Sequence, residues 1–252
     1  MRKLLISLPF LFTSLYAQES LQDLNFVPKQ STMSLQYRTS DNKSDVLLNQ
    51  KVIVENETST EQDYKFSLAL HDNVELGFLV KNNSSSKEDN NRPGGLLSIR
   101  VLNEFEQNPL SIIVGARSQN EVKEIFVSLF KSNESLQFKT TFRGIEIDSR
   151  KEMSGQSIGN DTQFQYHLNE YLAFDLGLSL SLATKIVNDG GAVDTGTPPY
   201  QTVTSLGLSV APTSSISASL GIARNETRVH YVNNNEVNIR SQNLYAQLGI
   251  KF

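Results

Sequence analysis

The sequence reads LAFDLGLSLSLA over residues 172–183, and large apolar side chains alternate with small or polar ones throughout this stretch. Successive side chains of a β-strand point to opposite faces, so Leu and Phe share one face while Asp, Gly and Ser share the other. Helical spacing would instead bring Leu176, Leu180 and Asp175 onto overlapping faces. The stretch therefore predicts a strand with one apolar and one polar face.

The same period of two recurs along most of the chain. It predicts strands near residues 62–70, 74–81, 95–102, 109–117, 123–131, 136–146, 161–168, 171–187, 201–210, 215–224 and 243–252. A membrane barrel with both ends in the periplasm needs an even number of strands, so a twelfth is expected upstream. Two segments compete for that place, one containing Met33, Leu35 and Tyr37 and the other running from Val46 to Val54.

The connections between these strands alternate in length. Short turns are expected at 71–73, 131–134, 169–170 and 211–214, and longer polar segments at 81–95, 147–160, 188–200 and 225–242. This alternation is typical of a transmembrane barrel, whereas a soluble β-sandwich gives no reason for it. Because unpaired strand edges cost several kcal/mol per group in hydrocarbon, the sheet must close. We predict an all-β protein, a closed antiparallel transmembrane β-barrel of about 12 strands, with 10 or 14 as alternatives.

The N-terminal residues predict export. Arg2 and Lys3 precede an apolar stretch from Leu4 to Leu15, and the sequence up to Ala17 ends in a plausible cleavage site. An N-terminal anchor is the alternative, but this stretch is short of the roughly 20 residues that span a bilayer. We expect residues 1–17 to be a signal peptide and residues 18–252 a barrel domain, with 18–30 as an N-terminal periplasmic segment.

The C-terminus points to a particular class of barrel. Leu244, Ala246, Leu248, Ile250 and Phe252 alternate up to the last residue. This end resembles the closing strand of bacterial outer-membrane β-barrel proteins of the porin-like class. The resemblance implies a Gram-negative outer membrane as location, its lipid as surroundings, and Phe252, Ile250 and Leu248 as a signal to the barrel-assembly machinery.

An aromatic belt is expected at the short-turn side of the barrel. Tyrosine and phenylalanine must form it, since the chain has no tryptophan. Its candidate members are Phe105, Phe130, Tyr166, Tyr171 and Phe252. The alternative is that the phenylalanines simply continue the lipid-facing stripe.

Composition and motifs give little support to catalysis or cofactor binding. The chain has no cysteine, which excludes disulfides and thiolate metal sites, and its net charge of −4 disfavours general nucleic-acid binding. Of its histidines, His71 and His167 fall in or beside predicted turns, and His230 lies in a predicted outer hairpin without the serine that a lipid hydrolase would need. We predict no catalytic, metal or cofactor site, with a membrane-embedded hydrolase as a low-ranked alternative.

The polar faces of the strands supply candidate pore-lining residues. Arg100, Arg117, Lys139 and Arg143 fall on nearby strands and form a basic stripe, which would favour anions. In the alternative, these cations pair with nearby carboxylates and fill the interior. The complete set of pore-lining candidates is Lys65, Glu75, Arg100, Arg117, Glu124, Lys139, Arg143 and Asp175.

Small inward residues on the later strands leave room in the interior. They are Gly177, Ser179, Ser181, Ser205, Gly207, Ser209, Ser217, Ser219 and Gly221. This volume favours a narrow passive channel for small polar or anionic solutes. The main alternative is a closed structural or surface-binding barrel whose outer loops contact ligands.

Overall fold

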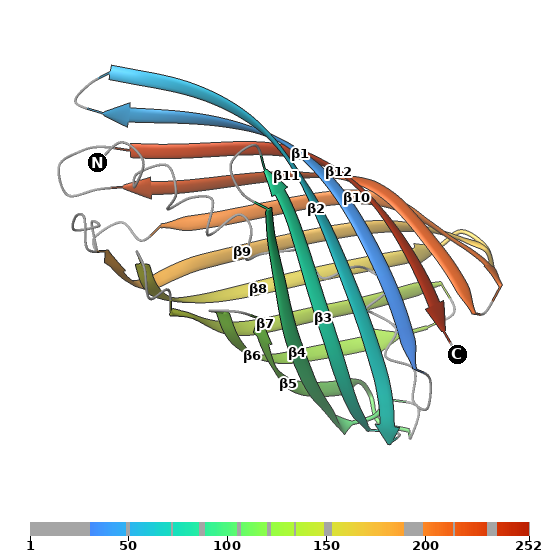
Figure 1. Cartoon of the computed structure of the whole chain (residues 1–252). Helices are drawn as coiled ribbons and strands as arrows, with labels where there is room; N and C mark the ends of the chain where they lie inside the picture. Colours follow the sequence, from blue (N-terminus) through green and yellow to red (C-terminus); the bar gives the residue numbers. More distant parts are fainter. Residues whose placement is uncertain are drawn as a thin grey trace.

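The structure is a computed structural model that describes residues 31–48, 51–71, 73–85, 89–104, 107–119, 122–133, 135–148, 153–188, 199–213, 215–230 and 236–251. Most of these residues form antiparallel strands (Figure 1). The strands are β1 (Thr32–Leu48), β2 (Lys51–His71), β3 (Val74–Ser85), β4 (Asp89–Leu102), β5 (Ser111–Gln119), β6 (Val122–Ser132), β7 (Leu136–Asp148), β8 (Met153–His167), β9 (Leu172–Asn188), β10 (Tyr200–Thr213), β11 (Ile216–His230) and β12 (Glu236–Lys251).

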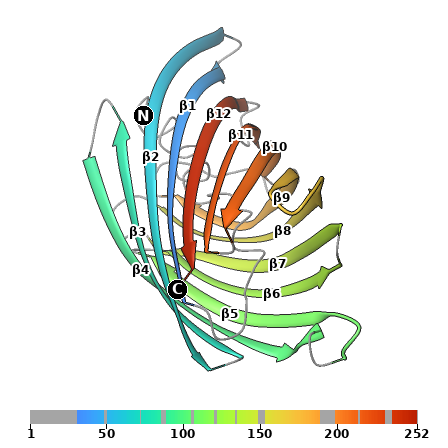
Figure 2. The ribbon, with the colours of Figure 1, turned by 90° about the vertical axis from the view of Figure 1, so that its right-hand side faces the viewer.

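Each strand pairs with its neighbours in sequence, and the first also pairs with the last. The β1–β12 register runs from Thr32 opposite Lys251 to Leu47 opposite Glu236. This pairing closes the sheet into a barrel, which Figure 2 shows with the right-hand end of Figure 1 turned toward the viewer. Closure removes the free strand edges that would otherwise expose unpaired N–H and C=O groups. The predicted all-β, antiparallel architecture is confirmed.

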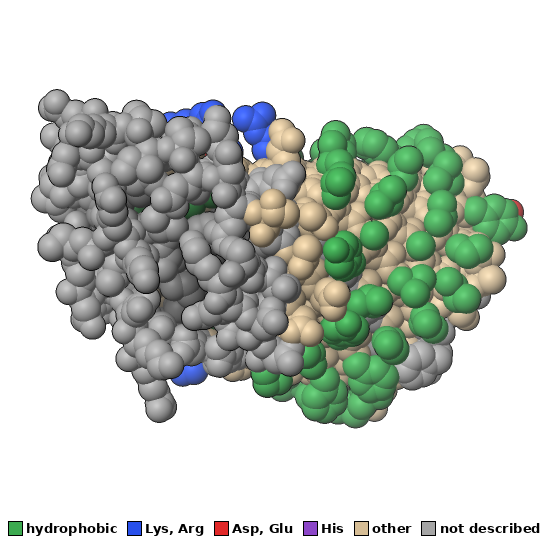
Figure 3. All heavy atoms as spheres, turned by 45° about the horizontal axis from the view of Figure 1, so that its top comes forward, with side chains coloured by type: hydrophobic (Ala, Val, Ile, Leu, Met, Phe, Trp, Pro, Cys, Tyr) green, Lys and Arg blue, Asp and Glu red, His purple; other side chains and the backbone are tan. Residues whose placement is uncertain are grey.

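The barrel wall separates apolar from polar side chains. On β9, Phe174 is 41% exposed, whereas the next residue, Asp175, is fully buried. The same alternation runs through most of the described strands, with the large apolar side chains on the outer face. Figure 3 shows many of them on the described part of the face in view. The period of two predicted these faces because strand geometry leaves each side chain only two directions.

Several strands extend further into the polar segments than the sequence predicted. β2 begins at Lys51 instead of near 62, β8 begins at Met153 instead of near 161, and β12 begins at Glu236 instead of near 243. The hydrophobic pattern fades there, but backbone pairing continues because ladder hydrogen bonds do not require apolar side chains.

The two upstream segments that competed for the twelfth strand do not exclude each other. β1 contains Met33 to Tyr37 and also Val46, while Val54 belongs to β2. The prediction was wrong in treating them as alternatives, because both segments belong to the long hairpin of β1 and β2.

Two sequence predictions fall partly outside the described residues. The expected signal peptide and the segment 18–30 lie outside them, and so do Phe105 and Phe252. Within the described part, Tyr166 and Tyr171 are exposed near the β8–β9 turn, as an aromatic belt requires. The belt prediction was wrong for Phe130, which is buried because it shares the inward face of β6 with Glu124.

Candidate functional site

The candidate site is the interior of the barrel. The eight predicted pore-lining residues all alternate with outward-facing neighbours, so their side chains point inward. Arg100, for example, is 3% exposed, whereas Ile99 and Val101 on either side are 46% and 62% exposed. Every strand from β2 to β9 except β8 carries at least one of these residues, so charged groups from much of the wall point into one space.

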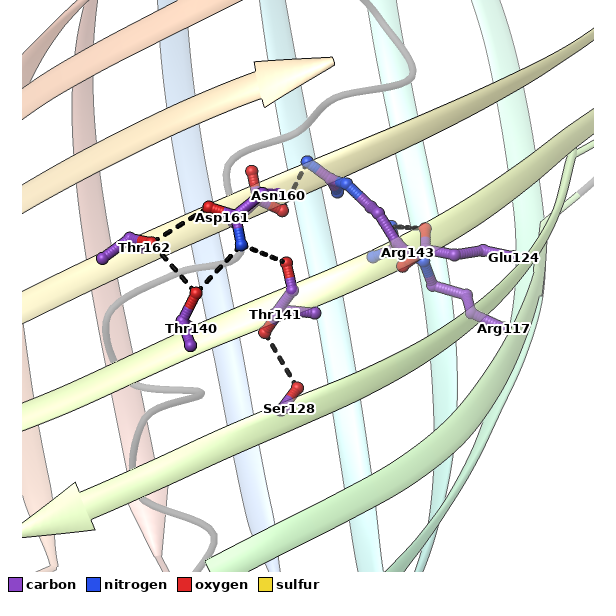
Figure 4. A network of polar contacts seen from close by, with 9 residues as sticks. All are labelled: Arg117, Glu124, Ser128, Thr140, Thr141, Arg143, Asn160, Asp161 and Thr162. Atoms are coloured by element: carbon purple, nitrogen blue, oxygen red, sulfur yellow. Dashed lines mark hydrogen bonds and ion pairs between the residues drawn. The ribbon is translucent and has the colours of Figure 1, made fainter. Parts of the chain in front are cut away.

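Arg117 and Glu124 form an ion pair across the β5–β6 hairpin. They lie directly opposite in the register, and Arg117 Nη2 is 2.5 Å from Glu124 Oε2 (Figure 4). Directly opposed residues on one face have Cβ atoms about 5 Å apart. At this separation a guanidinium group can form hydrogen bonds to a carboxylate. The short turn between β5 and β6 fixes this register. One cation of the predicted stripe is thus neutralised by its hairpin partner.

A second pair joins β2 to β3. Lys65 Nζ lies 3.7 Å from Glu75 Oε1, and the Ser98 hydroxyl of β4 donates a 2.9 Å hydrogen bond to the other carboxylate oxygen. Glu75 therefore receives donors from both neighbouring strands. This arrangement agrees with the alternative in which basic residues are matched by carboxylates.

The structure adds charged pairs that sequence reasoning missed. Arg143 Nη2 lies 2.5 Å from Asp161 Oδ2 on β8, and Lys81 pairs with Glu61 between β3 and β2. Asp161 was overlooked because the predicted strand began at that residue. The signal was present, since Asp161 continues the inward series of Gln163 and Gln165.

The remaining candidates also have neighbours within the wall. Asp175 accepts a 2.9 Å hydrogen bond from Gln165 Nε2 and another from the Ser209 hydroxyl, so polar amide and hydroxyl groups hold it in place. Arg100 Nη1 donates to Asn103 Oδ1 at 3.2 Å. Lys139 is buried and lies on the same inward face of β7 as Arg143. The predicted basic stripe is therefore interrupted by acidic and amide partners.

The opposite part of the wall is neutral and contains one large aromatic side chain. Tyr245 of β12 lies over Gly221 and Gly207, whose positions form one row across β11 and β10. A Cβ added at Gly221 would lie 2.4 Å from Tyr245 Cζ, and one at Gly207 would lie 2.6 Å from the Tyr245 hydroxyl. The tyrosine thus occupies part of the volume that the small residues were expected to leave open.

The outer face carries a polar cluster within its apolar belt. Asn160 Nδ2 donates to Thr140 Oγ1 at 2.9 Å, and Thr162 Oγ1 donates to Asn160 Oδ1 at 3.1 Å (Figure 4). The Thr140 and Thr162 hydroxyls lie 3.0 Å apart. Their mutual hydrogen bonds lower the cost of placing these groups in hydrocarbon. The sequence analysis did not identify this cluster.

The three histidines lie on three different strands, β2, β8 and β11. His71 and His167 lie at the ends of β2 and β8, and the side chain of His230 lies outside the description. Among the described residues, no three His, Cys, Asp or Glu side chains gather closely enough to hold a metal ion. The same part of the chain contains no helix long and apolar enough to cross a membrane.

The comparisons with known proteins identify the fold. The sequence matches no protein-family model and no curated protein. Among solved structures, an outer membrane channel from Pseudomonas putida F1 is similar over 93% of this chain and 100% of its own, with a TM-score of 0.63 and 16% identity. The NanC porin is similar over 83% of this chain and 98% of its own, with a TM-score of 0.53 and 10% identity. The chain therefore has the fold of bacterial outer-membrane β-barrel proteins.

Proposed function

We propose that the protein is a passive channel of the bacterial outer membrane for small polar solutes, with little preference between anions and cations. The observation that carries this proposal is the barrel wall itself, which is apolar outside and lined inside by charges matched across neighbouring strands. An apolar outer band suits lipid, and a polar interior suits water and hydrophilic solutes. The similarity of fold to an outer membrane channel and a porin supports the same conclusion.

The matched charges set the expected selectivity. A passing ion near Arg117 also meets Glu124, whose carboxylate lies 2.5 Å from the guanidinium. The two opposite charges act on that ion as a dipole, whose field falls off faster with distance than that of a single charge. The same holds for two further ion pairs, Arg143–Asp161 and Lys65–Glu75. The pairing therefore argues against the strong anion preference that a basic stripe would impose.

The size of the barrel sets the expected limit on solutes. Side chains fill barrels of about 8 strands, whereas those of 16 or more leave an aqueous channel. A barrel of twelve strands lies between these cases. Tyr245 and Arg143 reach inward from different parts of the wall and narrow the interior further. We expect passage of solutes the size of a monosaccharide, without a bound cofactor.

A closed structural barrel is the second candidate. The observation in its favour is the burial of inward polar groups, since Asp175 is fully buried and Arg143 and Arg100 are nearly so. Paired charges that pack against one another exclude water from the same space. The two candidates differ in one measurable property, which is permeability.

Liposome swelling distinguishes them. Protein purified from the outer-membrane fraction and reconstituted into liposomes should admit pentoses within seconds and admit tetrasaccharides at least about tenfold more slowly, because the lumen is narrow. Liposomes prepared with the same protein after heat unfolding serve as the control. Equal, background-level swelling for every sugar would favour the closed barrel and contradict the channel.

A further inference from the structure

Three arginines gather on the outer surface of β11 and β12. Arg224 and Arg228 alternate with Glu226 along β11, and Arg240 of β12 lies opposite Glu226 in the register. Ile222, the next outward residue below them, is exposed and apolar, so all four side chains belong to the lipid-facing row and not to the interior. We call these four residues the outer basic patch.

The patch lies where the apolar belt ends. The outward row of β11 starts at Ile216 and continues through Leu220 and Ile222 before reaching Arg224. With a rise of about 3.3 Å per residue and a tilt of about 40°, Arg224 lies roughly 20 Å and Arg228 roughly 30 Å above Ile216. A typical apolar band is about 25 Å tall. The patch therefore spans the outer interface, where lipid headgroups lie.

The charges of the patch do not cancel. Arg228 Nη2 lies 2.9 Å from Glu226 Oε1, and Arg240 Nε lies 3.9 Å from the same oxygen. One carboxylate thus faces two guanidiniums, and Arg224 is exposed on the same strand. The net charge of the patch is +2. Arg240 is the diagonal partner of both Arg224 and Arg228, about 7–8 Å from each, whereas Arg224 and Arg228 lie about 13 Å apart along β11. A phosphate group at this surface can contact two guanidiniums at once.

Other described outward positions at this end of the barrel lack such an excess. On β6, the exposed Lys123 lies opposite the exposed Glu146 of β7, which balances it. Among the described outward positions at this end, the excess of positive charge is therefore confined to β11 and β12.

We propose that the outer basic patch binds the phosphate groups of an outer-leaflet lipid. Guanidinium groups suit this role because they bind phosphate in a bidentate manner and remain charged at all physiological pH values. The aliphatic stems of the arginines can lie along the acyl chains while their charged ends reach the headgroups. The proposal rests on the outer-membrane location proposed above and is independent of whether the lumen conducts.

The test measures lipid retention on the folded barrel in detergent by native mass spectrometry. The probes are diphosphoryl lipid A and monophosphoryl lipid A, which differ by one phosphate. Wild-type protein should retain the diphosphoryl form several-fold more tightly. Arg224→Gln with Arg240→Gln should weaken it by about 25-fold, at about fivefold per cation, while leaving the Arg228–Glu226 pair in place.

Two further variants separate phosphate recognition from damage to the fold. Glu226→Gln should strengthen retention by about fivefold, because it removes the anion of the patch, and a loss of folding cannot produce a gain. Lys123→Gln should leave retention unchanged.

Equal retention by wild type and the double arginine variant would overturn the proposal. So would displacement of the lipid by inorganic phosphate at an equal concentration, which would indicate a site for the free anion. Because the readout is lipid retention, a barrel without conductance can still pass this test.

Discussion

Replacing Glu124 with Gln should turn a weakly selective channel towards anions, and replacing Arg117 with Gln should turn it towards cations. Each change removes one member of a pair whose atoms lie 2.5 Å apart and leaves the other charge without that partner in the lumen. At about 5–10 Å and an effective dielectric between those of protein and water, one charge biases a passing ion by about 1 kcal/mol. The permeability ratio should therefore shift about fivefold in each direction.

The measurement is the reversal potential of each variant under a KCl gradient. The double variant Glu124→Gln with Arg117→Gln should return to the wild-type ratio, because both charges are gone. The shifts should shrink at 1 M salt, where screening acts over about 3 Å. If both single variants keep the wild-type reversal potential while still conducting, the Arg117–Glu124 pair does not face the conduction path.

Replacing Gly221 with Ala should strongly impair the folded barrel. Its Cβ would lie 2.4 Å from the Leu206 carbonyl oxygen and 2.4 Å from Tyr245 Cζ. The carbonyl belongs to the paired β10 backbone and cannot move without breaking hydrogen bonds between the strands. We therefore expect the free energy of unfolding to fall by about 3 kcal/mol or more. The measurement is the urea midpoint of unfolding in detergent, read from heat-modifiable migration on gels.

Gly95→Ala is the matched control, because its Cβ would meet only the Gly77 carbonyl oxygen, at 3.9 Å. A second comparison tests the position of the tyrosine. Gly207→Ala should also destabilise the barrel, and Tyr245→Phe should partly rescue it, because the closest atom to the new Cβ is the Tyr245 hydroxyl at 2.6 Å. Equal stability of the Gly221 and Gly95 variants would contradict the close packing of Tyr245 over the glycine row.

The faces of the wall could be predicted because strand geometry allows only two side-chain directions. The alternation from Leu172 to Ala183 is sufficient to assign each side chain to the inner or the outer face. The same holds for the terminal strand, whose Leu248 and Ile250 are exposed. The inward direction of Tyr245 was equally predictable, because Tyr245 follows the outward-facing Leu244 on the same strand. The small residues of the neighbouring strands indicated open volume, which Tyr245 fills in part.

The charge pairs could not be assigned from alternation alone. Pairing depends on register, and register is set by hairpin turns such as the one between Gln119 and Val122. A one-residue change in that turn would separate Arg117 from Glu124. Asp161 was missed for a related reason, because β8 extends eight residues further towards its start than its apolar pattern indicated. The faces of the strands were therefore predictable, whereas the partners across them were not.

Current through a planar lipid bilayer tests the central claim most directly. Folded wild-type protein should insert in discrete steps with a small, voltage-independent conductance, and a KCl gradient should produce a reversal potential close to zero because the lumen charges are paired. Folded protein that inserts without any current steps would contradict the channel, and a strongly anion-selective current would contradict the neutralised lumen.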